Sequence, residues 1–333
     1  MENRMNWEKQ KVLVTGGSGF IGSHLVEKLV SLGADVRVLG HYNSQNRLGL
    51  LDTLPDEIKE KIRVIWGDIK EAESVEKAGQ DCRVIFHLAA LVGIPYSYRQ
   101  PQDVVMTNVI GTLNVLKFAR DSGAEKVVIT STSEVYGTAR YVPIDENHPL
   151  QGQSPYSASK IAADKITESF YCTYDLPVAV CRPFNTYGPG QSMRAVIPTI
   201  ITQALSRGEV RLGALSPTRD FTFVRDTVAG FIKIAESPRT VGEVINIGSG
   251  FEISIGDLAL KICALTGKNV PVVSEEARQR PEKSEVNRLF AANKKARELV
   301  GWQPQVSLDD GLKQTISWMA AAADRYQPDK YYV

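Results

Sequence analysis

Apolar runs rich in β-branched residues recur along the first half of the chain, with stretches of helical spacing between them. The runs are KVLVT (11–15), DVRVL (35–39), IRVIW (62–66), VIFHLA (84–89), KVVITS (126–131) and VAVCR (178–182). They are apolar nearly throughout, which is typical of strands buried on both faces of a sheet. Strands that alternate with helices in this way predict an α/β fold built on a doubly wound parallel sheet. The longest helices are expected at about 103–121 and about 157–174.

The pattern loosens in the second half of the chain. Short strands are predicted at FTFV (221–224) and EVINIG (243–248), and helices near 254–266 and 307–323. We therefore expect a large domain over residues 8–182 and a smaller lobe mainly over 183–330, packed against the carboxyl edge of the sheet. Residues of about 220–250 are expected to return to the large domain.

Composition removes several classes of function. The 39 basic and 38 acidic residues are nearly balanced and form no basic block, which argues against nucleic acid as a partner. The polar N-terminus is unlike a secretory signal, and no apolar run approaches the roughly 20 residues that a membrane span requires. The four cysteines are scattered and no His/Cys cluster has ligand spacing, so no metal site is predicted. We expect a reduced, cytoplasmic protein without a membrane partner.

A glycine-rich turn lies between the first predicted strand and the first predicted helix. The stretch TGGSGFIG (15–22) carries Gly16, Gly19 and Gly22 at GxxGxxG spacing. The first glycine permits a tight turn, the second lets a pyrophosphate approach the backbone, and the third lets helix and strand pack closely. The helix N-terminus then offers N–H groups to the phosphates. The large domain is therefore predicted to be a Rossmann domain that binds a dinucleotide.

The end of the second strand departs from the usual dinucleotide pattern. An acidic residue that binds the ribose 2′-hydroxyl is expected there, and this chain has Gly40. His41, Asn43, Ser44 and Arg47 could contact either a hydroxyl or a 2′-phosphate, so these residues leave NAD and NADP both open. Asp68, in GDI after the third strand, is a candidate to bind the adenine amino group.

A tyrosine and a lysine mark the start of the second long helix. In PYSASK (155–160), Tyr156 and Lys160 are four residues apart, so their side chains share one helix face. An ammonium beside a phenol stabilises the phenolate and lowers the pKa of the tyrosine. The pair therefore predicts that Tyr156 acts as a base near neutral pH.

A second cluster of reactive side chains ends the fifth predicted strand. TSTSEVYG (130–137) places Thr132, Ser133 and Glu134 in a row, directly after the apolar run KVVI. A carboxylate beside two hydroxyls is an unusual way to end a buried strand. We expect this strand end to meet the Tyr156 helix at the reacting centre.

These motifs together resemble the extended short-chain dehydrogenase/reductases of the nucleotide-sugar epimerase/dehydratase group. The stretches that carry the resemblance are TGGSGFIGSHL, GDI, HLAA (87–90), TNVIGTLNVL (107–116), STSEVYG, PYSASK, RPFNTYGP (182–189), RDFTFVRD (219–226) and VINIGSG (244–250). Within the group the chain is most similar to 4,6-dehydratases of the legionaminic-acid type, through RPFNTYGPGQSMRAVIPTIITQ, PTRDFTFVRDT and RPEKSEV.

The resemblance implies tightly held NAD, a nucleotide-sugar substrate and a homodimer formed through the two long helices. Thr132 would hydrogen-bond the sugar 4-hydroxyl, Tyr156 would take its proton, and Lys160 would also hold the nicotinamide ribose. Asn108 would support a helix kink and a proton path to Lys160. Further cofactor contacts are implied for Phe20, Ile21, Ile69, Leu88, Ala89, Ala90, Asn108 and Pro183. Substrate contacts are implied for Asn185, Val196, Arg211, Arg219 and Arg280, with Asn185, Arg219 and Arg280 at the pyrophosphate.

Glu134 favours one reaction of the group over the others. After oxidation of sugar C4 to a ketone, a dehydratase must remove the C5 proton and release water from C6, whereas a 4-epimerase needs no such carboxylate. Glu134 can supply the C5 base, and Ser133 or protonated Glu134 can assist at C6. We therefore expect a 4,6-dehydratase acting on UDP- or GDP-N-acetylglucosamine. A 4-epimerase and a UDP-glucuronate decarboxylase, which also shows Thr-Ser-Glu, are the alternatives, and a non-catalytic dinucleotide sensor is the competing class.

Overall fold

The computed structural model describes residues 5–268 and 270–322. A seven-stranded sheet forms the centre of the molecule, with every pair of neighbouring strands parallel and the order β10-β6-β5-β4-β1-β2-β3. Its strands are β1 (Lys11–Thr15), β2 (Asp35–Gly40), β3 (Ile62–Trp66), β4 (Val84–His87), β5 (Lys126–Thr130), β6 (Val178–Pro183) and β10 (Val244–Ile247). The predicted α/β fold with a doubly wound parallel sheet is confirmed.

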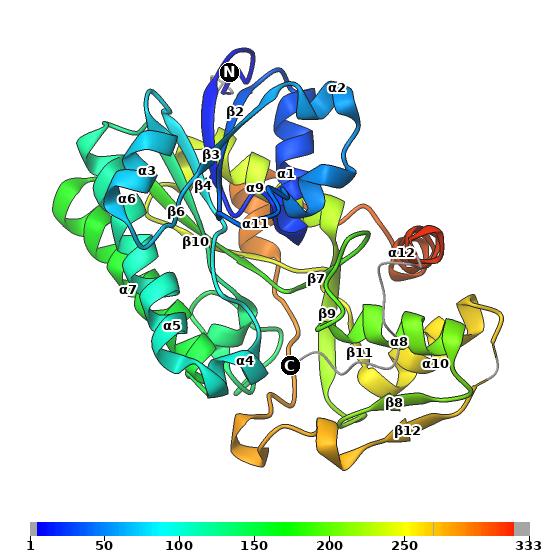
Figure 1. Cartoon of the computed structure of the whole chain (residues 1–333). Coiled ribbons are helices and arrows are strands. Elements are labelled where there is room, and N and C mark those ends of the chain that lie inside the picture. The colour runs from blue at the N-terminus through cyan, green and yellow to red at the C-terminus, as the bar shows by residue number, and fades with distance from the viewer. Residues whose placement is uncertain (1–4, 269, 323–333) are drawn as a thin grey trace.

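Helices cover both faces of this sheet, as the uniformly apolar strands require (Figure 1). In β1, Val12 and Val14 pack into one hydrophobic core and Leu13 packs into the other. Side chains alternate between faces along a strand, so a strand apolar at every position fills two cores. The first face carries α3 (Ala72–Gly79), α6 (Gly111–Asp121) and α7 (Pro155–Tyr174). The second carries α1 (Phe20–Ser31), α9 (Val224–Glu236) and α11 (Lys294–Val300).

The helix predicted at 103–121 is longer and interrupted in the structure. It consists of α5 (Pro101–Val105), a π-helical turn η2 (Met106–Ile110) and α6. Such turns often occur at functional sites, and this one contains the predicted kink residue Asn108. Two strands end earlier than their apolar runs, β4 at His87 and β5 at Thr130. The residues beyond them turn into loops at the carboxyl edge of the sheet.

A smaller lobe lies beside that edge (Figure 1). It contains the sheet β11-β9-β7, the pair β12-β8 and three helices. Their bounds are β7 (Asn185–Tyr187), β8 (Val210–Leu212), β9 (Thr218–Phe223), β11 (Glu252–Ser254), β12 (Val272–Ser274), α8 (Val196–Ser206), α10 (Ile255–Leu265) and α12 (Leu308–Ala321). The remaining short helices are α2 (Asp56–Lys59) and α4 (Ile94–Arg99), with 3-10 turns at η1 (Gly49–Thr53), η3 (Ser133–Tyr136), η4 (Pro238–Thr240), η5 (Glu276–Arg278) and η6 (Glu282–Ser284).

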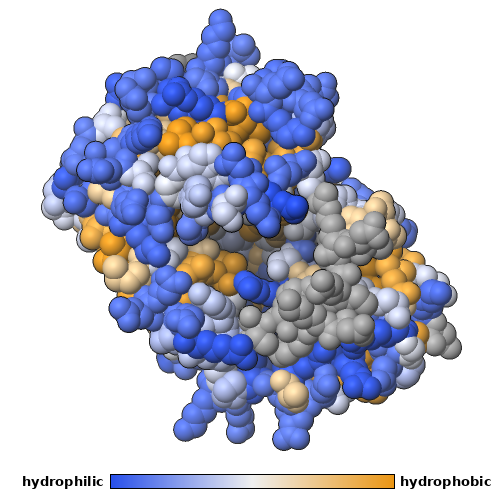
Figure 2. Space-filling view, viewed as in Figure 1, coloured by the Kyte–Doolittle hydropathy of each residue, from blue (hydrophilic) through white to orange (hydrophobic). Residues whose placement is uncertain are grey.

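The chain passes between the two lobes more than once. It leaves the large sheet after β6, and α9 and β10 then return to the large sheet, where β10 pairs with β6. Figure 2 shows that hydrophilic residues dominate the viewed face and that the surface is hollowed between the lobes. No helix within residues 5–268 and 270–322 is long and apolar enough to cross a membrane.

Candidate active site

The turn between β1 and α1 has the geometry of a phosphate cradle. Gly16 has φ +73°, and a Cβ there would lie 2.6 Å from the backbone nitrogen of Ala89. A Cβ on Gly22 would lie 2.1 Å from the carbonyl oxygen of Gly16. Only glycine fits either position. Helix α1 begins at Phe20 after Gly19, with no side-chain cap and no acidic residue in its first turn, so nothing there competes with an anion.

The loop after β4 packs against this turn. Its backbone is attached to the end of β1, because the Leu88 N–H donates to the Thr15 carbonyl (3.0 Å) and the Ala89 N–H to the Thr15 hydroxyl (3.3 Å). The structure therefore brings Leu88, Ala89 and Ala90 beside the glycine turn. These three residues and the glycine turn are predicted cofactor contacts from two separate parts of the sequence.

Asn108 connects the same loop to helix α7. Its amide accepts from the Leu91 N–H (2.8 Å) and donates to the Leu91 carbonyl (3.1 Å) and to the Ser159 hydroxyl (2.9 Å). Asn108 is almost fully buried, so these contacts fix the π-helical turn against α7. Its partner is Ser159, the residue before Lys160.

The structure explains why an acidic residue is absent at the end of β2. A Cβ on Gly40 would lie 3.0 Å from Cγ1 of Val64 and 3.3 Å from the Trp66 ring, so the neighbouring strand leaves little room for a side chain. His41 and Arg47 are exposed in the loop that follows. Asn43 closes that loop, because its side chain donates to the Arg47 carbonyl and accepts from the Arg47 N–H.

Asp68 and Ile69 lie at the end of β3 and have different surroundings. Asp68 accepts from the Lys70 N–H (2.9 Å), and its carboxylate lies 3.5 Å from the Lys70 ammonium. Ile69 is buried against Gly111, where a Cβ would come within 2.6 Å of its side chain. An adenine contact by Asp68 stays a prediction.

Helix α7 begins where its sequence provides a capping box. Ser154 accepts from the Ser157 N–H (3.1 Å), and the Ser157 hydroxyl accepts from the Ser154 N–H (3.0 Å). Pro155 occupies the first helical position, which suits its fixed φ. These contacts set the first turn, and Tyr156 and Lys160 follow on one face of it.

The expected lowering of the Tyr156 pKa is wrong for this structure. Burial raises the pKa of Tyr156, and the Glu134 and Asp164 carboxylates raise it further, while interaction with the Thr132 side chain lowers it. The prediction considered only the nearby Lys160. In the structure the Lys160 ammonium donates to the Thr130 carbonyl. Burial lowers the pKa of Lys160 to about 8, and Asp164 opposes that shift.

The residues after β5 form the 3-10 turn η3. Thr132 is its N-cap and accepts from the Glu134 N–H (3.2 Å), so it lies two residues beyond the strand rather than ending it. Ser133 is buried and Glu134 is half-buried. The η3 turn contacts α7, so the strand end meets this helix, as predicted.

Two of the predicted phosphate arginines meet at one carboxylate. Arg219 of β9 lies 3.1 Å from Glu285, and Arg280 lies 3.7 Å from the same Glu285 oxygen. Burial lowers the pKa of Arg219, and the Glu134 carboxylate opposes this shift. Asn185 Nδ2 and Arg280 Nη1 are buried and have no hydrogen-bond partner within the described residues. Such donors fit an anionic ligand.

The remaining predicted cofactor and substrate contacts lie on other elements of the fold. Pro183 ends β6 beside Asn185, and Val196 is the half-buried first residue of α8. Arg211 of β8 is half exposed and pairs with Glu209 and Glu275, not with the Glu285 cluster.

Sequence reasoning missed several residues of this site. Glu285 lies within RPEKSEV, but nothing in that stretch indicates that it pairs with Arg219. His87 was predicted as part of a strand and of the HLAA stretch, without a role of its own. It is fully buried, hydrogen-bonded to the Thr15 and Thr112 hydroxyls (2.7 and 3.0 Å), and its pKa is lowered to about 3 by burial and by Lys160. A histidine ending an otherwise apolar strand was the available signal.

Comparison with known proteins assigns the family. The family model described as GDP-mannose 4,6 dehydratase matches residues 13–315. The chain belongs to the nucleotide-sugar epimerase/dehydratase family of extended short-chain dehydrogenase/reductases. It is 32% identical to a putative UDP-glucose 4-epimerase of Methanocaldococcus jannaschii, over 92% of this chain and 98% of that protein. It is 34% identical to a UDP-N-acetyl-alpha-D-glucosaminuronate decarboxylase of Bacillus cytotoxicus, over 93% and 98%.

A family member with a solved structure has the same fold. The dTDP-glucose 4,6-dehydratase DesIV of Streptomyces venezuelae, solved with NAD bound, superposes with a TM-score of 0.85 at 31% identity, over 96% of this chain and 100% of that one. Dehydratase, epimerase and decarboxylase are therefore represented at similar identity. The comparison shows an enzyme family whose members share a fold and differ in reaction.

Proposed function

We propose that this family member is a 4,6-dehydratase that converts UDP- or GDP-N-acetylglucosamine to a 4-keto-6-deoxy sugar. The observation that carries the proposal is the position of Glu134. It lies one turn beyond the strand end, is capped by Thr132, and acts electrostatically on both Tyr156 and Arg219. Because the η3 turn contacts α7, the Glu134 carboxylate is proposed to reach a sugar carbon next to C4 when Thr132 and Tyr156 hold the 4-hydroxyl.

The residues present fit NAD as the cofactor. The glycine cradle at Gly16 and Gly22 and the uncapped start of α1 fit a pyrophosphate. The crowding at Gly40 accounts for the missing acidic residue without a requirement for a 2′-phosphate. NAD would accept hydride from sugar C4 and return it at C6.

The oxidation half of the reaction is assigned to Thr132, Tyr156 and Lys160. Tyr156 takes the proton of the sugar 4-hydroxyl, and Thr132 accepts or donates a hydrogen bond at the same oxygen. Burial leaves the Tyr156 phenol neutral at rest, so proton removal must be assisted when the substrate oxygen is in place. Lys160 is buried one turn after Tyr156 on α7 and is proposed to supply positive charge to the site.

The elimination half is assigned to Glu134 and Ser133. Once C4 is a ketone, the C5 proton is acidic and the Glu134 carboxylate removes it. The C6 hydroxyl then leaves as water, with the proton supplied by Glu134 or by hydrogen bonding from Ser133. The C5 proton and the C6 hydroxyl together make up the water lost. The hydride taken from C4 would return at C6 and a proton from solvent would be added at C5, so no external reductant or oxidant is consumed.

The diphosphate is assigned to Arg219, Arg280 and Asn185. Asn185 Nδ2 and Arg280 Nη1 are buried donors without a hydrogen bond, although Nη1 lies 3.7 Å from Glu285, and Arg219 is a buried guanidinium. Arginine binds phosphate oxygens through planar, charge-assisted hydrogen bonds. Val196 and Arg211 are proposed contacts of the nucleoside.

A homodimer is proposed through α5, η2 and α7. These elements pack on one another and expose the large apolar side chains of Val105, Met106, Tyr171 and Tyr174. Exposed apolar groups on neighbouring helices suit a helix-to-helix interface between two copies.

Glu134→Gln tests the proposal. The amide keeps the size of the side chain but cannot take the C5 proton. We expect one round of C4 oxidation, seen as a persistent rise in reduced-nicotinamide absorbance, with loss of product and of C5 deuterium exchange from heavy water. Glu125→Gln is the matched control, since Glu125 is exposed at the opposite end of β5. Near-normal formation of 4-keto-6-deoxy product by Glu134→Gln would remove the assigned role.

The wild-type protein separates the alternative reactions. A panel of nucleotide sugars is incubated in heavy water and the products are analysed by NMR. C5 exchange with a 4-keto-6-deoxy product supports dehydration. A 4-epimer without exchange would make this an epimerase, and carbon dioxide with a pentose product would make it a decarboxylase. Denaturation of the purified protein releases the bound dinucleotide, and recovery of NADP alone would refute NAD.

A further inference from the structure

A buried ion pair lies directly behind the proposed catalytic residues. Arg182 of β6 donates to one Asp164 carboxylate oxygen through Nε (3.1 Å) and Nη2 (2.9 Å). Both side chains are only 4% exposed. A buried ion pair is a weak source of net stability, because desolvation of the charges offsets their attraction. Its presence here calls for another role.

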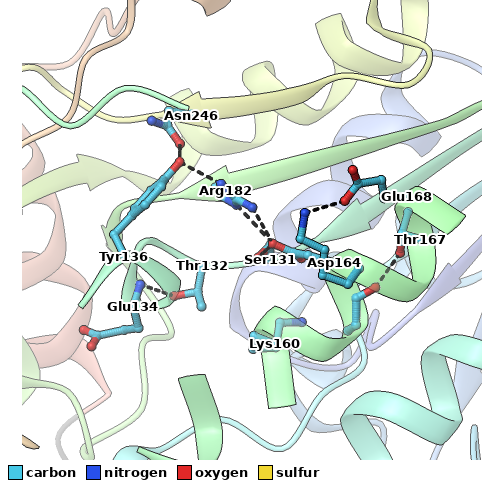
Figure 3. Close-up of polar contacts among 12 residues, drawn as sticks. Ser131, Thr132, Glu134, Tyr136, Lys160, Asp164, Thr167, Glu168, Arg182 and Asn246 are labelled. Carbon is cyan, nitrogen blue, oxygen red and sulfur yellow. Dashed lines mark hydrogen bonds and ion pairs between the residues drawn. The ribbon is translucent and has the colours of Figure 1, made fainter. Parts of the chain in front are cut away.

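The pair is the centre of a hydrogen-bond network that reaches three strands (Figure 3). Ser131, which follows β5, donates to the same Asp164 oxygen (2.8 Å). Arg182 also donates to the Tyr136 hydroxyl (3.0 Å), and Tyr136 donates to Asn246 of β10 (2.7 Å). All five side chains are buried.

Two members of the network adjoin the segment that carries the residues assigned to catalysis. Ser131 directly precedes Thr132. Tyr136 ends the η3 turn that carries Glu134. Because backbone neighbours move together, fixing Ser131 and Tyr136 fixes both ends of the segment that presents the reactive side chains.

The same network reaches Lys160 along helix α7. Asp164 lies one turn beyond Lys160, and its charge raises the Lys160 pKa against the effect of burial. The neutral His87 of β4 also interacts electrostatically with Lys160, and Tyr156 precedes Lys160 by one turn on the same helix. Glu134 of η3 faces the Tyr156 phenol, and Arg182 faces Asp164 from β6.

We infer that Asp164 and Arg182 are positioning residues of the active site, which align the η3 segment with α7 and keep Lys160 charged. This inference rests on the proposed C4 oxidation by Thr132, Tyr156 and Lys160, but not on the later dehydration. Ser131, Tyr136 and Asn246 transmit the alignment. The Asp164 carboxylate supplies the negative charge nearest to Lys160 on its helix.

The charge effect has a definite sign. Asp164 raises the pKa of both Lys160 and Tyr156. Asp164→Asn removes that charge, so both pKa values fall. The measured quantity is the rate at which substrate reduces the bound cofactor, followed as a function of pH. Both the acid and the alkaline limb of this profile should move to lower pH, by about 1 unit. Loss of a purely structural contact would lower the rate without moving the limbs.

Glu168→Gln is the matched control for charge. Glu168 lies one turn beyond Asp164 on α7, and its side chain is 57% exposed and paired with Lys165. The same change of charge at this solvated position should leave both limbs in place. Asp164→Glu, which keeps the charge, should keep the limbs and lose rate through displaced geometry.

A second readout does not require turnover. With lysine labelled at ¹³Cε, NMR titration follows the Lys160 side chain, which is assigned by its absence in Lys160→Met. The midpoint, which is the pKa of Lys160, is expected at about 8 in the wild-type protein, and Asp164→Asn should lower it. An unchanged midpoint together with unmoved limbs would overturn the inference. If none of the nucleotide sugars reduces the cofactor of the wild-type protein, the proposed function is wrong. The Lys160 titration still tests the positioning role in that case.

A double variant keeps the alignment testable if Asp164→Asn fails to fold. Asp164→Leu combined with Arg182→Met removes both buried charges, a replacement that proteins often tolerate. Without the anchors, cofactor reduction at the pH optimum should fall by about 10-fold or more. A folded double variant that reduces its cofactor at the wild-type rate would refute the positioning role.

Discussion

Glu285 provides a sharp test of the proposed diphosphate site. One of its carboxylate oxygens lies 3.1 Å from Arg219 and 3.7 Å from Arg280. The same two guanidinium groups are proposed to bind the substrate diphosphate. A carboxylate and a diphosphate compete for the same donors, so Glu285→Gln should bind nucleoside diphosphates more tightly than the wild-type protein.

The size of the effect follows from the contact distance and the exposure of the pair. Unit charges 3.1 Å apart attract by about 5 kcal/mol at an effective dielectric constant of about 20. The Arg219 and Glu285 side chains are 8% and 18% exposed, so solvent and salt screen part of this attraction. The incoming phosphates also replace much of it. A remaining competition of about 1–2 kcal/mol corresponds to an approximately 5- to 30-fold lower Kd.

Isothermal titration with UDP, GDP and dTDP measures this change directly. Glu282→Gln is the matched control, because Glu282 is an exposed glutamate of the same segment. The gain should shrink as salt is raised, since the competing charges are partly screened. An unchanged or weaker affinity in Glu285→Gln would show that Glu285 supports the arginines instead of competing with the ligand. An equal gain in affinity in Glu282→Gln would show that the effect comes from the change in net charge alone.

Two further variants test the tyrosine and the helix that carries it. Tyr156→Phe should keep the fold and the bound cofactor but lose about 10²- to 10⁴-fold in turnover, measured as product formed per enzyme. The control is Tyr141→Phe, at an exposed tyrosine. Activity of Tyr156→Phe within threefold of wild type would contradict the role of Tyr156 as base. Ser154→Ala removes the N-cap of α7 and should cost about 1 kcal/mol, which lowers Tm by about 1–2 °C in a protein of 333 residues. Calorimetry checks this against Ser169→Ala, an exposed serine of the same helix; equal shifts would contradict the capping argument.

The elements of the fold and the local motifs could be predicted because short-range physics determines them. Uniformly apolar runs identified six strands of the large sheet. The GxxGxxG turn predicted a close approach that the structure shows at Gly16 and Gly22. The spacing of Tyr156 and Lys160 placed both on one face of α7. Each of these features depends on residues within a few positions of one another, so periodicity and steric rules suffice.

The electrostatics of the site depended on contacts that no local pattern contains. Lys160 alone predicted a lowered Tyr156 pKa, but burial and the carboxylates of Glu134 and Asp164 raise it. The sequence shows Arg182 as a charged residue within an apolar strand, but it does not show that Asp164 is its partner. The partner could be known only once β6 lay beside β5 and α7 crossed their ends.

The sequence by itself therefore determined the α/β class and the dinucleotide turn, and it supplied the candidate reactive side chains. Tertiary structure alone decided that β10 pairs with β6, that Glu285 joins Arg219 to Arg280, and that a network behind η3 connects Asp164 to Asn246. The physical reason is separation along the chain. Residues 66 positions apart, such as Arg219 and Glu285, become neighbours only through the cooperative packing of many elements. Hydrogen bonds and charges acquire their strength from the burial that this packing creates.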